Sequence, residues 1–268
     1  MAAYPTGVGR VRASAFEEGD FMAVTQDMAS EDANCSAIDD DRLLERIGAW
    51  GGLAYLLVFG AGWLLVARFF PPIPPSNDAS AVAQQFQDRR IPLMVASVML
   101  MCSTFFLFPF SALWVMVVRK LEGRVGMATL MLGFTFATYM VSNFYTPFSF
   151  AMSAFRPERD AELIQYSSDY GFLQFVGGIP LFLMVWIISA YVVLFSSSRR
   201  APIVPRWYGY FTLWIAVLYL PELLVFFFKT GPFAWNGIVG FWIPAVLFIA
   251  YFLVSPFILV PLVKRKVV

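Results

Sequence analysis

Apolar segments of membrane-spanning length are the feature that most constrains how this chain folds. A helix needs roughly 20 predominantly apolar residues to cross the hydrocarbon core of a bilayer. Six segments of about that length, separated by charged or turn-forming residues, cover 47–69, 91–118, 125–153, 172–195, 207–228 and 238–262. The sequence therefore predicts an all-α integral membrane protein built on a six-helix transmembrane bundle.

The amino-acid composition supports this prediction. Hydrophobic residues make up 59% of the chain and charged residues 14%, whereas charged residues are about 25% of a typical soluble domain. Residues 1–41 are the polar exception, with nine acidic side chains and two arginines. Low hydrophobicity and net negative charge predict a disordered cytoplasmic tail there, followed by a transmembrane domain over 42–268. A partner-docking segment around Phe16 and Phe21 is the alternative for the tail.

Basic residues are distributed unevenly between the two sides of the predicted bundle. One side collects most of them, within 42–46, 119–124, 199–206 and 264–266. Because cytoplasmic loops of membrane proteins are enriched in lysine and arginine, we expect both termini to be cytoplasmic. We expect the location to be the plasma (inner) membrane.

The first two outer connections are predicted to contain short amphipathic helices. In the first, apolar residues recur at helical spacing behind Asp78, a candidate N-cap. In the second, Pro157 suits a first helical turn. The expected inward stripe of this second helix is Leu163, Ile164, Ser167 and Tyr170.

The chain lacks the side chains that several cofactors require. It contains no histidine, and its two cysteines, Cys35 and Cys102, do not have metal-ligand spacing. Histidine-ligated haem, copper, zinc and di-iron sites are therefore excluded within this chain. No lysine lies inside an apolar segment to form a Schiff base, and no basic patch supports nucleic-acid binding. We predict no metal, no cofactor and no nucleic-acid partner.

Glu222 is the only acidic side chain well inside an apolar segment. An ionisable group at membrane depth is costly, and it marks a functional site by default. Along a continuous α-helix, Glu222 lies about 10 Å below Lys229 and on nearly the same face. It either forms a structural ion pair with Lys229, Arg156 or Arg159, or stays protonated through desolvation and acts as a proton carrier or acid.

Segment 125–153 is the most polar of the six. Its Asn143 has a side chain that hydrocarbon cannot satisfy, so it must face protein or water. The choice between an interhelical hydrogen bond and contact with a ligand stays open for Asn143. The candidate ligand-binding residues are the polar side chains predicted near the depth of Glu222 or at the outer surface, namely Glu222, Asn143, Tyr139, Tyr145, Tyr219, Arg156, Arg159 and Lys229.

Three classes of function remain open at the level of the sequence. In the first, an outer-half cavity binds or transports a hydrophobic or amphiphilic small molecule, and the protein acts alone, as a homo-oligomer or as an accessory subunit of a membrane complex. In the second, a cofactor-free enzyme acts on a lipid or terpenoid by acid catalysis at Glu222. The third is a structural membrane scaffold. One carboxylate without an evident base is weak support for catalysis, which favours the first class.

Overall fold

The computed structural model describes residues 41–178, 180–195 and 203–266. The predicted acidic tail, apart from Asp41, lies outside these residues. Residues Glu45–Val268 form one compact unit. Its described residues are helical or irregular, with no strand among them, so the prediction of an all-α protein is confirmed for this part of the chain.

The elements follow the apolar segments closely. The first helix runs over Asp41–Val66 and ends in the π-helical turn η1 (Ala61–Val66). The remaining elements, in chain order, are α2 (Ala79–Asp88), α3 (Arg90–Ser103), η2 (Thr104–Phe106), α4 (Leu107–Glu122), α5 (Met127–Phe155), α6 (Ala161–Gly177), α7 (Pro180–Phe195), α8 (Arg206–Tyr219), η3 (Leu220–Phe226), η4 (Ile238–Trp242) and α9 (Ile243–Lys264).

Five helical stretches among the described residues are long and apolar enough to cross a membrane. They are Asp41–Val66, Arg90–Glu122, Ala161–Phe195, Arg206–Phe226 and Ile238–Lys264. The chain is therefore a multi-pass integral membrane protein. The remaining predicted segment, 125–153, corresponds to α5, which is 29 residues long. Helix α5 is less apolar than the five spans because hydroxyl and amide side chains interrupt it.

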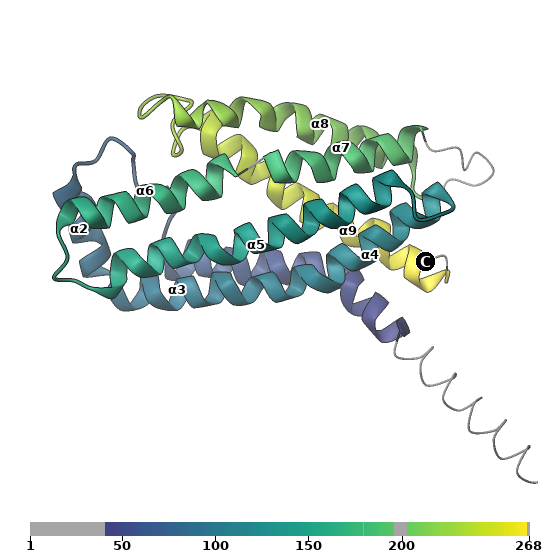
Figure 1. The fold of residues 1–268 in the computed structure, drawn as a ribbon, viewed down its shortest axis with the longest axis horizontal. Coiled ribbons are helices and arrows are strands. Elements are labelled where there is room, and N and C mark those ends of the chain that lie inside the picture. Colours follow the sequence, from purple (N-terminus) through teal and green to yellow (C-terminus); the bar gives the residue numbers. More distant parts are fainter. Residues whose placement is uncertain (1–40, 179, 196–202, 267–268) are drawn as a thin grey trace, which may run out of the picture. The chain divides into compact units, whose positions relative to one another are not determined.

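Helix α5 is the element against which most of the others pack. Figure 1 shows α3 and α4 continuing in one line, as α6 and α7 do, with α5 alongside both pairs. Helix α7 also packs against α8. The neighbours of α5 matter because polar side chains in a membrane helix need partners from other helices.

Two of the predicted spans are interrupted near a proline. Proline lacks a backbone N–H and clashes with the carbonyl four residues earlier, which breaks the α-helical hydrogen-bond pattern. Between α3 and α4 the chain tightens into the 3₁₀ turn η2, three residues before Pro109. Similarly, α8 ends at Tyr219 and the chain continues as the 3₁₀ helix η3, with Pro221 at its start. Segment 207–228 is therefore not the continuous α-helix assumed when Glu222 was placed relative to Lys229.

The amphipathic helix predicted in the first connection is present as α2. Its N-cap is Asp78, whose carboxylate accepts a hydrogen bond from the Ala81 backbone N–H at 2.8 Å. Val82, Ala83 and Phe86 form its buried face, as the spacing predicts.

A helix is present in the second connection, as predicted, but it is not a short separate one. The chain instead forms the 17-residue α6, which begins after Pro157 and leads toward α7 within one candidate span. Its buried face includes Ile164, Ser167, Ser168 and Gly171, whereas Leu163 and Tyr170 are exposed. Half of the expected stripe, Ile164 and Ser167, is therefore buried, and the face of α6 that packs along α5 and α2 excludes the other half.

Glycines of the first helix lie directly against the α3–α4 segment. A Cβ built on Gly48 would lie 2.6 Å from the Pro109 carbonyl oxygen, and one on Gly51 would lie 2.6 Å from that of Phe106. Both distances are shorter than any normal Cβ contact, so only glycine allows this approach. By contrast, Gly60 has no atom within 4 Å of the equivalent position.

Candidate functional site

A cavity of about 590 Å³ lies among the first helix, α5, α6, η3, η4 and α9. Its volume is within the range of roughly 300–1,000 Å³ that is usual for small-molecule sites. Aliphatic and aromatic side chains form most of its wall. The aromatic members include Phe59, Trp63, Phe175, Phe182, Phe241 and Phe248.

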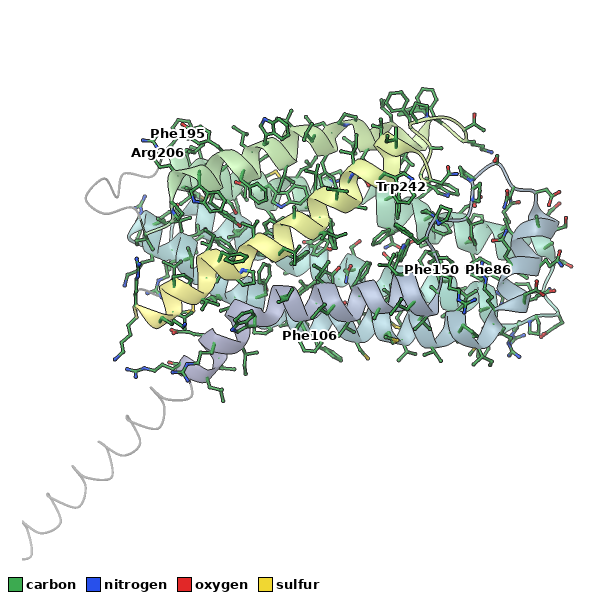
Figure 2. All side chains as sticks on the ribbon, turned by 180° about the vertical axis from the view of Figure 1, so that it is seen from behind. Phe86, Phe106, Phe150, Phe195, Arg206 and Trp242 are labelled. Carbon is green, nitrogen blue, oxygen red and sulfur yellow. The ribbon has the colours of Figure 1, made fainter. Side chains whose placement is uncertain are left out.

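The cavity opens between the first helix and α9. Four exposed aliphatic side chains line it there. Three belong to the first helix and one to α9: Leu57 (63% exposed), Leu64 (41%), Leu65 (73%) and Ile249 (42%). Figure 2 shows α9 crossing the first helix obliquely, so that the two separate toward Trp242. These exposed aliphatic side chains belong to two of the candidate membrane spans, where such side chains are suited to contact hydrocarbon.

Four of the eight candidate residues line this cavity. Tyr139, Asn143, Tyr219 and Glu222 reach it from three elements, α5, α8 and η3. Tyr219 also lies within electrostatic range of both Tyr139 and Glu222. The structure thus brings together side chains that are up to 83 residues apart in the sequence.

The other four candidates lie elsewhere. Tyr145 is on α5 with 56% of its surface exposed. Arg156 follows the end of α5 and is exposed, and Arg159 donates a hydrogen bond from Nη1 to the carbonyl of Met152 at 3.1 Å. Lys229 is exposed beyond η3 and interacts electrostatically with Asp169.

Asn143 makes interhelical hydrogen bonds, one of the two alternatives that the sequence left open for it. Its Oδ1 accepts from the Tyr55 hydroxyl at 3.0 Å, and its Nδ2 donates to Thr104 Oγ1 at 3.0 Å. The Tyr55 hydroxyl oxygen also lies 3.3 Å from that of Tyr139. These contacts join the first helix, η2 and α5, so Asn143 holds one wall of the cavity in place.

Glu222 is buried without the ion pair considered above. Its side chain is 4% exposed, and Oε2 has no hydrogen-bond partner among the described residues. The expected pairing with Lys229 is not formed there because η3 is a 3₁₀ helix that ends at Phe226, which removes the α-helical spacing between the two residues. Among the described residues that line the cavity, Glu222 has the only carboxylate, and none has a basic side chain.

Three buried polar atoms of the cavity residues lack hydrogen-bond partners within the described chain: Trp63 Nε1, Gln174 Oε1 and Glu222 Oε2. An unsatisfied buried polar group costs about 1–3 kcal/mol. Sequence reasoning did not select Trp63 or Gln174. The signal available for Gln174 was an amide inside the predicted apolar segment 172–195, the same signal that identified Asn143. Nothing in the sequence distinguished Trp63 from a packing residue.

The fold defines the class of this chain, a multi-pass helical membrane protein, and the described residues enclose a mostly apolar cavity. Comparison with protein-family models, with curated proteins and with solved structures gives no match.

Proposed function

We propose that this protein binds or transports a hydrophobic or amphiphilic small molecule in the cavity between the first helix and α9. The observation that carries the proposal is that three residues lining a mostly apolar cavity, Trp63, Gln174 and Glu222, each have a buried polar atom without a hydrogen-bond partner among the described residues. Buried polar groups in proteins are normally hydrogen-bonded. A ligand with a polar group and an apolar body would satisfy these atoms and fill the remaining volume.

The lipid-facing opening supports a ligand that reaches the site through the bilayer. Exposed aliphatic side chains at the opening present no polar barrier to a lipid-soluble molecule. Such a molecule would also lose little hydration on entry, because its apolar body is already out of water in the bilayer. Entry of the ligand from the membrane is compatible with two roles, a carrier and a binding subunit of a larger membrane complex.

A six-span arrangement forms part of the proposal, with α5 as the sixth span. Helix α5 has the length to cross a bilayer and contains no charged residue. Its polar side chains find partners on neighbouring helices, as Asn143 does with Tyr55 and Thr104. With six spans and the distribution of basic residues described above, both termini are cytoplasmic and the cavity lies in the outer half of a plasma membrane.

Acid catalysis at Glu222 has less support. An enzyme needs a second polar group positioned to accept or deliver a proton near the reacting atoms. The described residues that line the cavity supply two tyrosines, a serine, a threonine, an asparagine and a glutamine beside Glu222, with no second carboxylate and no basic side chain. Binding or transport requires only the complementarity that the cavity already has.

Filling the cavity tests the proposal. We expect Ala245→Phe, in the cavity wall of α9, to displace a molecule that co-purifies with the wild-type protein and is detected by mass spectrometry after extraction. Ala250→Phe is the matched control, since Ala250 is similarly half-buried on α9 but does not line the cavity. Equal retention of every co-purified molecule by both variants would contradict binding in this cavity.

A further inference from the structure

The unpartnered atoms of the cavity favour one kind of ligand head. Glu222 Oε2 and Gln174 Oε1 accept hydrogen bonds, and Trp63 Nε1 donates one. Acceptors therefore predominate, and the carboxylate of Glu222 has no cation to pair with among the described cavity residues. A buried carboxylate in apolar surroundings is stabilised by a charge-assisted hydrogen bond from a cation.

The two acceptor residues, Gln174 and Glu222, belong to elements that contact each other. Helix α6 carries Gln174 and η3 carries Glu222, and the two elements pack against each other. Their approach is close: a Cβ on Gly177 of α6 would lie 2.2 Å from the Phe226 ring of η3. Both residues line the same cavity from elements that pack together, an arrangement compatible with one ligand head in contact with both.

Aromatic rings surround this polar region. The lining includes seven Phe and Trp side chains, contributed by the first helix, the connection that follows it, α6, α7, η4 and α9. The faces of aromatic rings carry partial negative charge and attract cations, with a contribution of roughly 0.5–2 kcal/mol per contact that is largest when the cation is desolvated. An anionic head would meet both these rings and Glu222 unfavourably.

We infer that the cavity binds an amphiphilic organic cation, a lipid-soluble amine whose protonated nitrogen donates hydrogen bonds to Glu222 and Gln174. This inference rests on the proposed function and specifies the chemical class of its ligand. The apolar part of the molecule lies toward the opening between Leu64 and Ile249, where it continues into the surrounding lipid.

Three probes with the same alkyl chain separate the ligand classes: dodecylamine, dodecanol and dodecanoate. Binding is measured at neutral pH by calorimetry to the full-length protein in phosphatidylcholine nanodiscs, after subtraction of empty nanodiscs. We expect the amine to bind at least tenfold more tightly than the alcohol, and dodecanoate more weakly than the alcohol. Equal affinities for amine and alcohol would overturn the inference.

Substitution of Glu222 tests the residue directly. We expect Glu222→Gln to weaken amine binding at least tenfold while leaving dodecanol affinity within about twofold, because the amide keeps the size of the side chain and one acceptor oxygen but removes the charge. Glu162→Gln is the matched control, since Glu162 is an exposed carboxylate in the first turn of α6. An unchanged amine affinity in a folded Glu222→Gln protein would contradict the inference.

Two further measurements keep the test decisive. Gln174→Leu removes the second acceptor and is expected to weaken amine binding several-fold even if Glu222→Gln does not fold. The cavity-filling variant Ala245→Phe distinguishes the two levels of proposal: if it displaces a co-purified neutral or anionic molecule, binding in the cavity stands and the cationic class is overturned. If it displaces nothing and no probe binds the wild-type protein, both proposals fail.

Discussion

At the scale of single residues, the structure separates polar side chains that hold the bundle together from those left without partners. Asn143 belongs to the first group, since Tyr55 and Thr104 use both ends of its amide. Glu222 and Gln174 belong to the second, since one oxygen of each has no hydrogen-bond partner in the described part of the chain. Both groups line one cavity, so the sequence signal they share, a polar residue in an apolar segment, does not by itself distinguish structure from function.

Removing the Asn143 amide tests its structural role. We expect Asn143→Leu to destabilise the folded protein by about 0.6–2 kcal/mol, because the Tyr55 and Thr104 hydroxyls lose an interhelical partner. Thermal unfolding in detergent compares this variant with Tyr145→Phe, whose hydroxyl is on an exposed residue of the same helix. Equal unfolding temperatures for the two variants would show that the amide contributes nothing measurable.

Asp78 gives a prediction about pH outside the membrane-spanning segments. Hydrogen bonds from the Ala81 backbone N–H and then from the Ser80 hydroxyl hold its pKa below the ordinary value of 3.8. Since the folded-state pKa is the lower one, the cap stabilises α2 above about pH 4 and the stabilisation is lost as the pH falls through the lowered pKa. We expect amide exchange in α2 to accelerate, beyond its intrinsic pH dependence, on acidification below pH 4.

The variant Asp78→Asn serves as the comparison, because asparagine caps a helix without a titrating group. Its α2 amides should lack this additional acid-induced loss of protection. The same acid response in both proteins would rule out Asp78 as its origin.

At the scale of the elements, the apolar segments predicted the helices well, while their interruptions and ends were less predictable. Pro221 signalled a break in segment 207–228, but a proline can kink an α-helix or end it. The change to a 3₁₀ helix at Leu220 moved Glu222 away from the expected spacing to Lys229. In the second outer connection, packing of α6 along α5 decided the length of the helix, and that information is not local to the segment.

Close packing of the first helix also belongs to this scale. We expect Gly48→Ala and Gly51→Ala each to destabilise the protein by about 1–3 kcal/mol, since the added methyl group meets a backbone carbonyl oxygen at 2.6 Å. Gly60→Ala is the matched control on the same helix, and alanine there should be neutral or stabilising because of its higher helix propensity. Comparable unfolding temperatures for all three variants would contradict the packing described here.

At the scale of the whole molecule, a multi-pass helical architecture was predictable because hydrocarbon imposes both the length and the composition of its spans. Half of the candidate residues could also be predicted to come together. Polar side chains inside apolar segments have to face protein, and four of them line one cavity: Tyr139, Asn143, Tyr219 and Glu222. The basic residues were selected as possible partners of Glu222 or of a ligand at the outer surface. Their long side chains can satisfy carbonyls at helix ends instead, as Arg159 does at Met152.

An experimental density map of the protein in lipid nanodiscs is the most direct measurement of the cavity and its occupant. We predict elongated density that enters between Leu64 and Ile249 and ends within hydrogen-bond distance of Glu222. A map in which those two side chains pack against each other, with Glu222 paired to a protein cation and no space beside it, would contradict a lipid-accessible binding site.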